Sequence, residues 1–268
     1  YVNGLRVRCH SHAAPLSLVP AIATSCNAFF CWGFKYMIDR KGTTAYEQLT
    51  RWKDYLVSMG YGYKLGIDIP NESRGFIPNA DFYNKAFKGG RWSANSVISV
   101  SIGQGEVLAT PLQIANLAAT IANRGYYYIP HVVKAVQDTV IDASYRKKHY
   151  TRVNMGYYTY IVQGMRKAVL GGTCRTANLP DIEVCGKTGT AQNPHGPDHS
   201  VFMGFAPMNK PKIAIAVYVE NGGWGATYGV PFGALMMEQY LKGKLSPENE
   251  LRAEEFSNRV ILYGNEER

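Results

Sequence analysis

Apolar residues recur at intervals of three and four through much of the first half of the chain. This spacing places side chains such as Phe30, Phe34 and Met37 on one face of a helix. Two capping boxes, Thr44–Glu47 and Thr110–Gln113, mark the starts of two such segments. The helices predicted in this half are 16–22, 28–41, 45–59 and 111–124.

The second half of the chain changes to strand periodicity. Alternate positions from Ile213 to Val219 are β-branched, as in a strand with one buried face. Strands are predicted at 182–192, 200–206 and 212–219, with a short turn that makes the last two an antiparallel hairpin. Helices are predicted before and after them, at 157–170 and 227–241. The fold class predicted is therefore α+β, an antiparallel sheet flanked by helices.

The remaining segments lack a clear period. Residues 61–90 are rich in Gly, Pro, Asn and Asp and are predicted to form an irregular surface segment. Residues 126–153 are predicted to form short strands and turns outside the core. We treat 1–268 as one partial domain, with a charged C-terminal tail at 243–268. Because the chain opens at Tyr1 rather than Met, we expect it to be N-terminally truncated.

Composition and charge narrow the choice of partner. With 46% apolar and 18% charged residues the chain is an ordinary globular protein, and no apolar run reaches the roughly 18 residues of a membrane span. The net charge is +9, but the densest basic cluster, Arg146–Lys148, lies in a polar stretch. We expect no nucleic-acid partner. An anionic cell-wall polymer or a lipid surface is equally compatible with this charge.

The five cysteines do not form a disulfide pattern. Their number is odd and they contain no Cys-x-x-Cys pair, so a disulfide scaffold is not expected at this length. Cys26, Cys31 and Cys185 lie in apolar segments and are predicted to be small core residues.

The candidate chemistry lies in two short motifs. Lys187, Thr188, Gly189 and Thr190 follow an apolar run, so in a strand the lysine and glycine point to one side and the threonines to the other. A cation and two hydroxyls beside bare backbone suit an anionic, peptide-like ligand. The second motif, Ser25-Cys26-Asn27, lies between two predicted helices, and its asparagine is expected to cap the second of them. Taken alone, each motif also fits a strand end or a helix cap.

Together with other stretches, these motifs resemble the transpeptidase domain of class B penicillin-binding proteins of the elongation type, penicillin-binding protein 2. Serine β-lactamases share only the short catalytic motifs. The further stretches that carry the resemblance are Ser101-Ile102-Gly103-Gln104-Gly105, Thr110-Pro111-Leu112-Gln113, Phe202-Met203-Gly204-Phe205-Ala206-Pro207 and Val219-Glu220-Asn221-Gly222-Gly223. The resemblance implies the penicillin-binding and serine β-lactamase-like fold and a D,D-transpeptidase that cross-links peptidoglycan through an acyl-enzyme.

The resemblance also implies a role for each motif residue. Ser25 would relay a proton to the leaving group, and Lys187 would supply positive charge beside it. Asn27 would bind the substrate amide. Thr188, Gly189 and Thr190 would line the substrate site, where the two hydroxyls bind the terminal carboxylate and the Thr190 N–H forms half of the oxyanion hole.

The nucleophile motif of the family, Ser-x-x-Lys, is expected before Ser25 and is missing there. The chain's own Ser-x-x-Lys, Ser144-Tyr145-Arg146-Lys147, comes later and in a charged stretch, so we interpret it as coincidental. We therefore expect this piece alone to be inactive. The alternatives are a non-catalytic β-lactam sensor or scaffold of the same fold, and a penicillin-hydrolysing enzyme.

The resemblance further implies partners, a location and, less directly, a metal. The expected ligands are peptidoglycan stem peptides and β-lactam antibiotics, with a membrane glycosyltransferase as protein partner. The expected location is the periplasmic face of the bacterial inner membrane. No cofactor is predicted, although some relatives bind zinc beside the active site. Cys9, His10, His12 and Cys26 are near in sequence, and His12 with Cys26 are the residues that would take part.

Overall fold

The structure is a computed structural model that describes residues 7, 9, 11–89, 91–137 and 139–261. The described chain forms two compact units. The first unit contains residues 26–157 with the described residues up to Leu16, and the second contains residues 17–25 and those from 158 onward. None of the helices in these described ranges is both long enough and apolar enough to cross a bilayer.

The first unit is mainly helical. Its elements are α2 (Asn27–Ile38), α3 (Ala45–Ser58), α4 (Ala80–Ala86), α5 (Pro111–Ala122), the 3-10 helices η1 (Ala94–Ile102), η2 (Ala143–Arg146) and η3 (Met155–Tyr157), and the two-residue strands β1 (Tyr126–Tyr127) and β2 (His149–Tyr150). The predicted apolar face of α2 is confirmed, since Phe34 and Ile38 are buried in one core with Leu49 of α3. The ring of Phe34 packs edge-on against Trp52 at 5.6 Å.

The start of α2 differs from the expectation. Cys26 rather than Asn27 is the cap, because its Sγ accepts the N–H of Phe29 at 3.4 Å and Asn27 is the first helical residue. The preceding Ser25 has φ 54° and ends the turn that follows the previous helix. Cys26 then has the extended backbone that a helix cap requires. Both predicted capping boxes, by contrast, are confirmed at the starts of α3 and α5.

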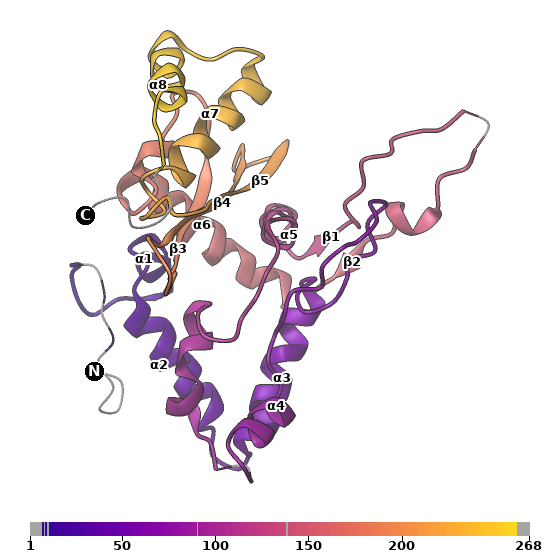
Figure 1. The fold of residues 1–268 in the computed structure, drawn as a ribbon, viewed down its shortest axis with the longest axis vertical. Coiled ribbons are helices and arrows are strands. Elements are labelled where there is room, and N and C mark those ends of the chain that lie inside the picture. The colour runs from indigo at the N-terminus through magenta and orange to yellow at the C-terminus, as the bar shows by residue number, and fades with distance from the viewer. Residues whose placement is uncertain (1–6, 8, 10, 90, 138, 262–268) are drawn as a thin grey trace. The chain divides into compact units, whose positions relative to one another are not determined.

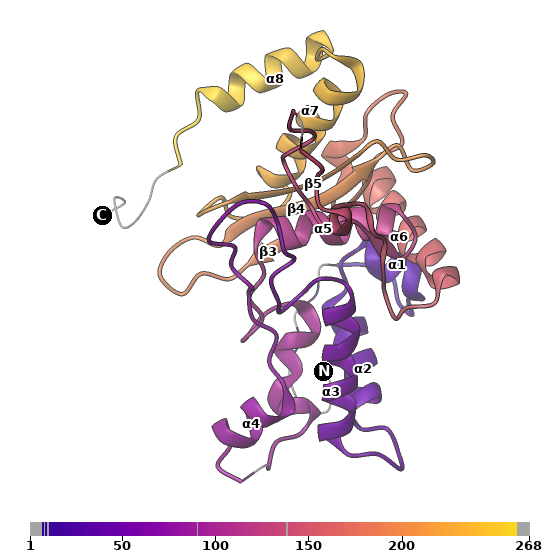
Figure 2. The ribbon, with the colours of Figure 1, turned by 90° about the vertical axis from the view of Figure 1, so that its right-hand side faces the viewer.

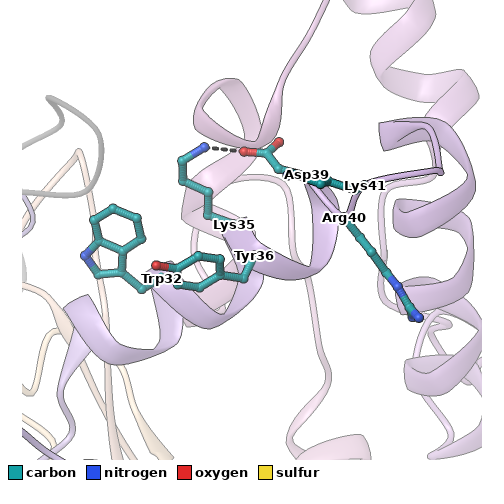
Figure 3. Close-up of a pocket in the computed structure, with 6 residues that line it drawn as sticks. All are labelled: Trp32, Lys35, Tyr36, Asp39, Arg40 and Lys41. Atoms are coloured by element: carbon teal, nitrogen blue, oxygen red, sulfur yellow. Dashed lines mark hydrogen bonds and ion pairs between the residues drawn. The ribbon is translucent and has the colours of Figure 1, made fainter.

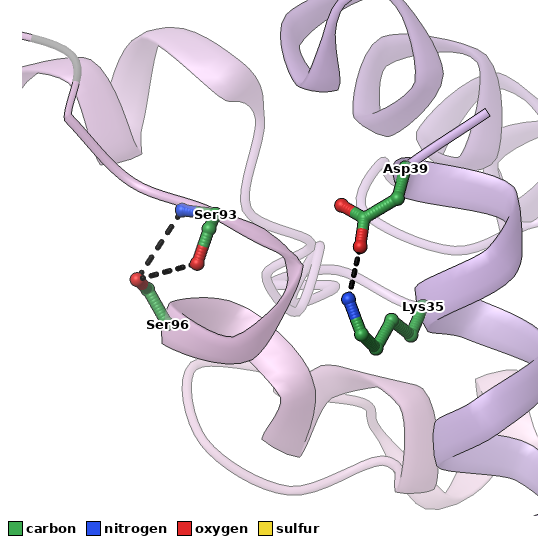
Figure 4. Close-up of polar contacts among 4 residues, drawn as sticks. All are labelled: Lys35, Asp39, Ser93 and Ser96. Atoms are coloured by element: carbon green, nitrogen blue, oxygen red, sulfur yellow. Dashed lines mark hydrogen bonds and ion pairs between the residues drawn. The ribbon is translucent and has the colours of Figure 1, made fainter. Parts of the chain in front are cut away.

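The outer face of α2 is polar and aromatic. Trp32 and Tyr36 lie one turn apart with ring centroids separated by 5.6 Å, and they line a shallow pocket on the helix surface together with charged side chains (Figure 3). Lys35 forms an ion pair with Asp39, the residue that caps the end of α2 (Figure 4). Figure 4 also shows the reciprocal contact at the start of η1, where the N–H of Ser93 donates to Ser96 Oγ at 3.2 Å.

Of the two segments without sequence periodicity, one departs from the prediction and the other matches it. Residues 61–90 are not simply surface, because they contain α4 and the fully buried Tyr83, whose hydroxyl donates to Glu106 at 2.7 Å. The buried face of α4 is too short to show a period in the sequence. Residues 126–153 do form an appendage: β1 pairs antiparallel with β2, and the long loop between them projects from the strands (Figure 1).

The second unit is built on an antiparallel sheet in the order β3-β4-β5, as predicted. Its elements are α1 (Leu18–Ala23), α6 (Tyr158–Gly171), η4 (Arg175–Ala177), β3 (Cys185–Ala191), β4 (His199–Ala206), β5 (Ile213–Val219), α7 (Gly229–Lys242) and α8 (Pro247–Ser257). α7 lies over the sheet, and α1 packs along α6 (Figures 1 and 2). Phe202 of β4 is fully buried between sheet and helix, in one core with Val230 and Ala234 of α7. β3 is left at the edge of the sheet.

Part of the expected charged tail is ordered as α8. Glu238 of α7 is fully buried and accepts hydrogen bonds from Asn249 at 2.5 Å and Ser246 at 3.3 Å. Phe256 packs edge-on against Phe232 of α7, with ring centroids 5.0 Å apart. These contacts between distant side chains attach α8 to the second unit.

Candidate active site

Ser25 lies on a tight turn directly after α1. Its N–H donates to the carbonyl of Ile22 at 3.2 Å, and Thr24 donates to the carbonyl of Pro20 through both its N–H and its hydroxyl at 2.9 Å. Ser25 itself adopts the left-handed conformation with φ 54°, which is unfavourable for a residue with a side chain. A strained serine held by its neighbours is typical of a functional position.

Lys187 on β3 extends to this turn. Its Nζ donates to Ser25 Oγ at 2.7 Å and to the carbonyl of Thr188 at 2.8 Å. The structure therefore brings together two of the predicted site residues from the two separate chain segments of the second unit. Both side chains are partly buried.

Burial sets the ionisation of the groups around Lys187. Removal from water lowers the pKa of Lys187 below its ordinary value, because the ammonium loses hydration. The neighbouring Cys174 is fully buried, and burial raises its pKa to about 11 against the opposing influence of the Lys187 charge. Cys174 is therefore a neutral thiol near pH 7, so it does not neutralise the lysine.

The hydroxyls of β3 are held by the surrounding loops. Thr188 Oγ1 donates to Thr173 Oγ1 at 2.8 Å, and Thr190 Oγ1 accepts the N–H of Gly225 at 3.2 Å. At Gly189 a side chain would start 3.2 Å from Cβ of Val201, so the missing side chain makes room for β4.

The other predicted residues are placed as follows. Asn27 is the first residue of α2, two positions after Ser25 in the chain and in the other unit. Ser144 of the second Ser-x-x-Lys lies in η2, on the appendage between β1 and β2, and Lys147 beside it is exposed. Sequence reasoning missed Thr173, because its partner Thr188 lies 15 residues further along. The only local signal was its place directly after a predicted helix end.

The metal candidates form a cluster in the first unit. The ligand atoms of Cys9, His12 and Cys26 all lie within 4.8 Å of one another, with the two sulfurs 3.8 Å apart. The sulfurs accept backbone N–H groups of Ala28 at 3.2 Å and Phe29 at 3.4 Å. His10, also named from the sequence, lies outside the described residues. Cys26, Cys31 and Cys185 are buried as predicted.

The state of His12 fits a metal ligand. Its Nδ1 lies 2.8 Å from the carbonyl of Ala13, which assigns the ring proton to Nδ1. Its Nε2 is buried and has no hydrogen-bond partner among the described residues. A buried ring nitrogen without a partner among the described residues, beside two thiols, is a donor set that suits zinc.

Comparison with known proteins gives a consistent result across the chain. The family model described as the penicillin binding protein transpeptidase domain matches residues 3–238. The peptidoglycan D,D-transpeptidase MrdA of Acinetobacter baumannii is 34% identical over 226 residues, which cover 77% of this chain and 32% of that protein. MrdA of Haemophilus influenzae is 32% identical over 221 residues, covering 74% of this chain and 33% of that protein. The chain thus spans about a third of the length of these relatives.

Solved structures agree on the fold. Penicillin-binding protein 2 of Pseudomonas aeruginosa matches with a TM-score of 0.72 at 30% identity, over 87% of this chain and 50% of that one. A complex of penicillin-binding protein 2 with MreC from Helicobacter pylori matches with a TM-score of 0.66 at 28% identity, over 84% of this chain and 40% of that one. A structure described as the coordination of polymerization and crosslinking by a peptidoglycan synthase complex matches with a TM-score of 0.75 at 30% identity, over 92% of this chain and 42% of that one.

Proposed function

Because this chain belongs to the family of the penicillin-binding protein transpeptidase domain, we propose that the protein is a serine-type peptidoglycan D,D-transpeptidase. The observation that carries the proposal is the contact of the Lys187 ammonium with Ser25 Oγ at 2.7 Å, on the sheet edge where Thr188 and Thr190 also lie. The names of the two MrdA relatives, both D,D-transpeptidases, support the same reaction.

The reaction proposed is acyl transfer between stem peptides. A serine oxygen attacks the carbonyl carbon of the D-Ala-D-Ala bond, the C–N bond breaks, and the terminal D-alanine leaves after its nitrogen takes a proton. An amine on a neighbouring strand then attacks the ester and releases the serine. A β-lactam follows the first half only, because its opened ring stays attached to the acyl group.

Each residue of the site has a part in that reaction. Ser25 transfers the proton to the leaving nitrogen, since its hydroxyl can donate one proton while it accepts another from Lys187. The positive charge of Lys187 favours the negative charge that develops during attack. Thr188 and Thr190 bind the terminal carboxylate, the Thr190 N–H stabilises the oxyanion, and Asn27 binds the substrate amide.

The nucleophile and its lysine are proposed to come from sequence preceding the Ser25 motif in the full-length protein. The similar proteins are more than twice as long as this chain, which leaves room for such a segment. Ser144 is not proposed as the nucleophile, because the segment that carries it is an exposed appendage.

The test is the intact mass of the protein encoded by the full gene after incubation with benzylpenicillin. We expect one stable penicilloyl adduct on a serine that precedes Tyr1. Ser144→Ala should leave the adduct unchanged, whereas Lys187→Ala should slow its formation. A folded protein that forms no adduct would contradict the proposal and favour a scaffold, whereas rapid loss of the adduct would indicate a penicillin-hydrolysing enzyme. An adduct without cross-linking of stem peptides would favour a sensor.

We further propose that the protein acts at the periplasmic face of the inner membrane beside a membrane glycosyltransferase. Support comes from two similar structures, one described as a peptidoglycan synthase complex and one solved with MreC. Co-purification of the full-length protein with a peptidoglycan polymerase from detergent-solubilised membranes is the expected result. Recovery of the protein in the cytosolic fraction alone would contradict it.

The cluster of Cys9, His12 and Cys26 is proposed to hold zinc as a structural site. Two thiolates and an imidazole nitrogen are zinc ligands, and tetrahedral zinc takes one further donor. Bound zinc would fasten the segment before α1 to the start of α2, because Cys9 and Cys26 come from these two places.

Elemental analysis of the purified protein tests this assignment. We expect about one zinc per chain and its loss in Cys9→Ser. Cys31→Ser is the matched control, because Cys31 is buried against Ser101 outside the cluster and its replacement should leave zinc in place. Metal-free wild-type protein in zinc-supplemented medium would contradict the site.

A further inference from the structure

A hydroxyl outside the sequence motifs lies against the proposed carboxylate site. Thr173, in the connection after α6, has its Oγ1 2.8 Å from Thr188 Oγ1. Both side chains are partly buried, and Thr173 belongs to neither of the two motifs. The contact is between side chains only, so it orients the Thr188 hydroxyl rather than the strand that carries it.

The backbone of Thr173 is held on its other side by the Ser25 turn. Its N–H donates to the carbonyl of Ala23, two residues before Ser25, at 3.1 Å. The residues on either side are fixed as well, since the N–H groups of Gly172 and Cys174 both donate to the carbonyl of Ala168, at 3.0 and 2.9 Å.

The close approach to the turn depends on the residue before Thr173. A Cβ on Gly172 would lie 2.1 Å from the carbonyl oxygen of Ala23, so a side chain there cannot be accommodated without moving backbone. Gly172 thus lets the backbone of Thr173 reach the turn.

These contacts form a closed ring. Lys187 donates hydrogen bonds to Ser25 and to the carbonyl of Thr188, and the hydroxyl of Thr188 donates to Thr173. The N–H of Thr173 donates to the carbonyl of Ala23, and the chain from Ala23 to Ser25 closes the ring. The ring joins the proton-transfer side of the site to its carboxylate-binding side. We propose that Thr173 is a positioning residue for Thr188, an inference that rests on the proposed transpeptidase function.

The chemistry of two adjacent hydroxyls explains what such a residue does. A hydroxyl has one proton to donate and two lone pairs that accept. Without substrate, Thr188 donates to Thr173. When a carboxylate binds, Thr188 turns its proton to the anion and accepts from Thr173 instead. The second hydroxyl thus keeps Thr188 in position and strengthens the hydrogen bond that it donates.

The test compares two probes on the protein encoded by the full gene: benzylpenicillin, which carries the carboxylate, and its methyl ester, which does not. The readout is the ratio of their second-order acylation rate constants. Because both probes react with the same preparation, the ratio does not depend on the fraction of folded protein.

We expect Thr173→Val to lower this ratio about fivefold, the effect of about 1 kcal/mol from one lost hydrogen bond. Thr173→Ser keeps the hydroxyl and should give the wild-type ratio. Thr173→Ala removes the hydroxyl without adding volume and should give the same ratio as Thr173→Val. Thr176→Val is the matched control, because Thr176 is exposed on the same segment.

The outcomes separate the inference from the function on which it rests. If Thr173→Val and Thr173→Ala slow the two probes by the same factor, or slow neither, the ratio is unchanged and the positioning role is overturned. Acylation of the wild type would then still support the transpeptidase. No acylation of the folded wild type by either probe would overturn the proposed function, and the positioning role with it.

Discussion

Lys187 Nζ lies 2.7 Å from Ser25 Oγ, although 162 residues separate them in the sequence. The contact joins the turn after α1 to the edge strand of the sheet, within one compact unit. A buried ammonium on a strained serine is costly for stability, so the arrangement is expected to be kept for chemistry.

Ser25 should separate strain from function. At φ 54° glycine is relaxed and alanine is not, so Ser25→Gly should be more stable than Ser25→Ala by about 1 kcal/mol. Both variants remove the hydroxyl and should slow acylation by benzylpenicillin alike. Urea unfolding together with acylation rates checks this. An alanine variant as stable as the glycine variant would show that the turn carries no strain.

The buried charge of Lys187 should lower the stability of the protein and favour acylation. Burial lowers its pKa, so between the lowered folded value and the ordinary value of 10.5 the unfolded chain binds more protons. Stability therefore rises with pH through that window, and below it the cost of the buried charge is present in full.

Lys187→Met should consequently raise the melting temperature at pH 7 and slow acylation. Its gain in stability over the wild type should shrink as pH rises through the window. Lys212→Met is the matched control, because Lys212 is exposed at the start of β5 and its change should alter neither property. Lower stability of Lys187→Met at pH 7 would refute the prediction.

Gly172 should be intolerant of a single added carbon. A Cβ there would lie 2.1 Å from the carbonyl oxygen of Ala23 and 2.7 Å from Cα of Ala168, both backbone atoms that no rotamer change can move. Gly172→Ala should destabilise by about 1–3 kcal/mol or more. Gly171→Ala, with nothing within 4 Å of the new atom, should be neutral or slightly stabilising. Chemical denaturation of both variants measures the contrast, and equal stabilities would refute it.

Gln113 and Glu47 occupy the same position in two capping boxes but should differ in how much they contribute to the free energy of unfolding. Glu47 is exposed, whereas Gln113 is 1% exposed and its Nε2 also serves the core. The carbonyls that accept from this Nε2 are those of Gly60, Tyr63 and Arg74, at 3.2, 3.1 and 3.0 Å.

Gln113→Ala should therefore cost at least about 2 kcal/mol more than Glu47→Ala, because the buried carbonyl of Gly60 and two partly buried carbonyls lose their donor. Thr110→Ala, which removes only the cap of α5, should cost about 1 kcal/mol. The three free energies of unfolding in urea give the comparison. A Gln113→Ala variant no less stable than Glu47→Ala would contradict it.

Local patterns explain which parts of the fold were predictable. The alternation from Ile213 to Val219 and the two capping boxes are decided by neighbours within a few residues, and the structure confirms them. The cap at Cys26 and the burial of Tyr83 were not predicted, because the first depends on the φ of the residue before it and the second on packing against distant helices.

By itself, the sequence determined most of the elements, the order of the strands and the residue types of the candidate site, because periodicity, caps and short motifs are local. It did not predict α4 and α8. Only the tertiary structure decided that Lys187 contacts Ser25, that Thr173 supports Thr188, and that Cys9 joins His12 and Cys26. The physical reason is that a hydrogen bond between distant side chains requires a position within a few tenths of an ångström. That position is set by sheet register and helix packing, which no short stretch of sequence contains.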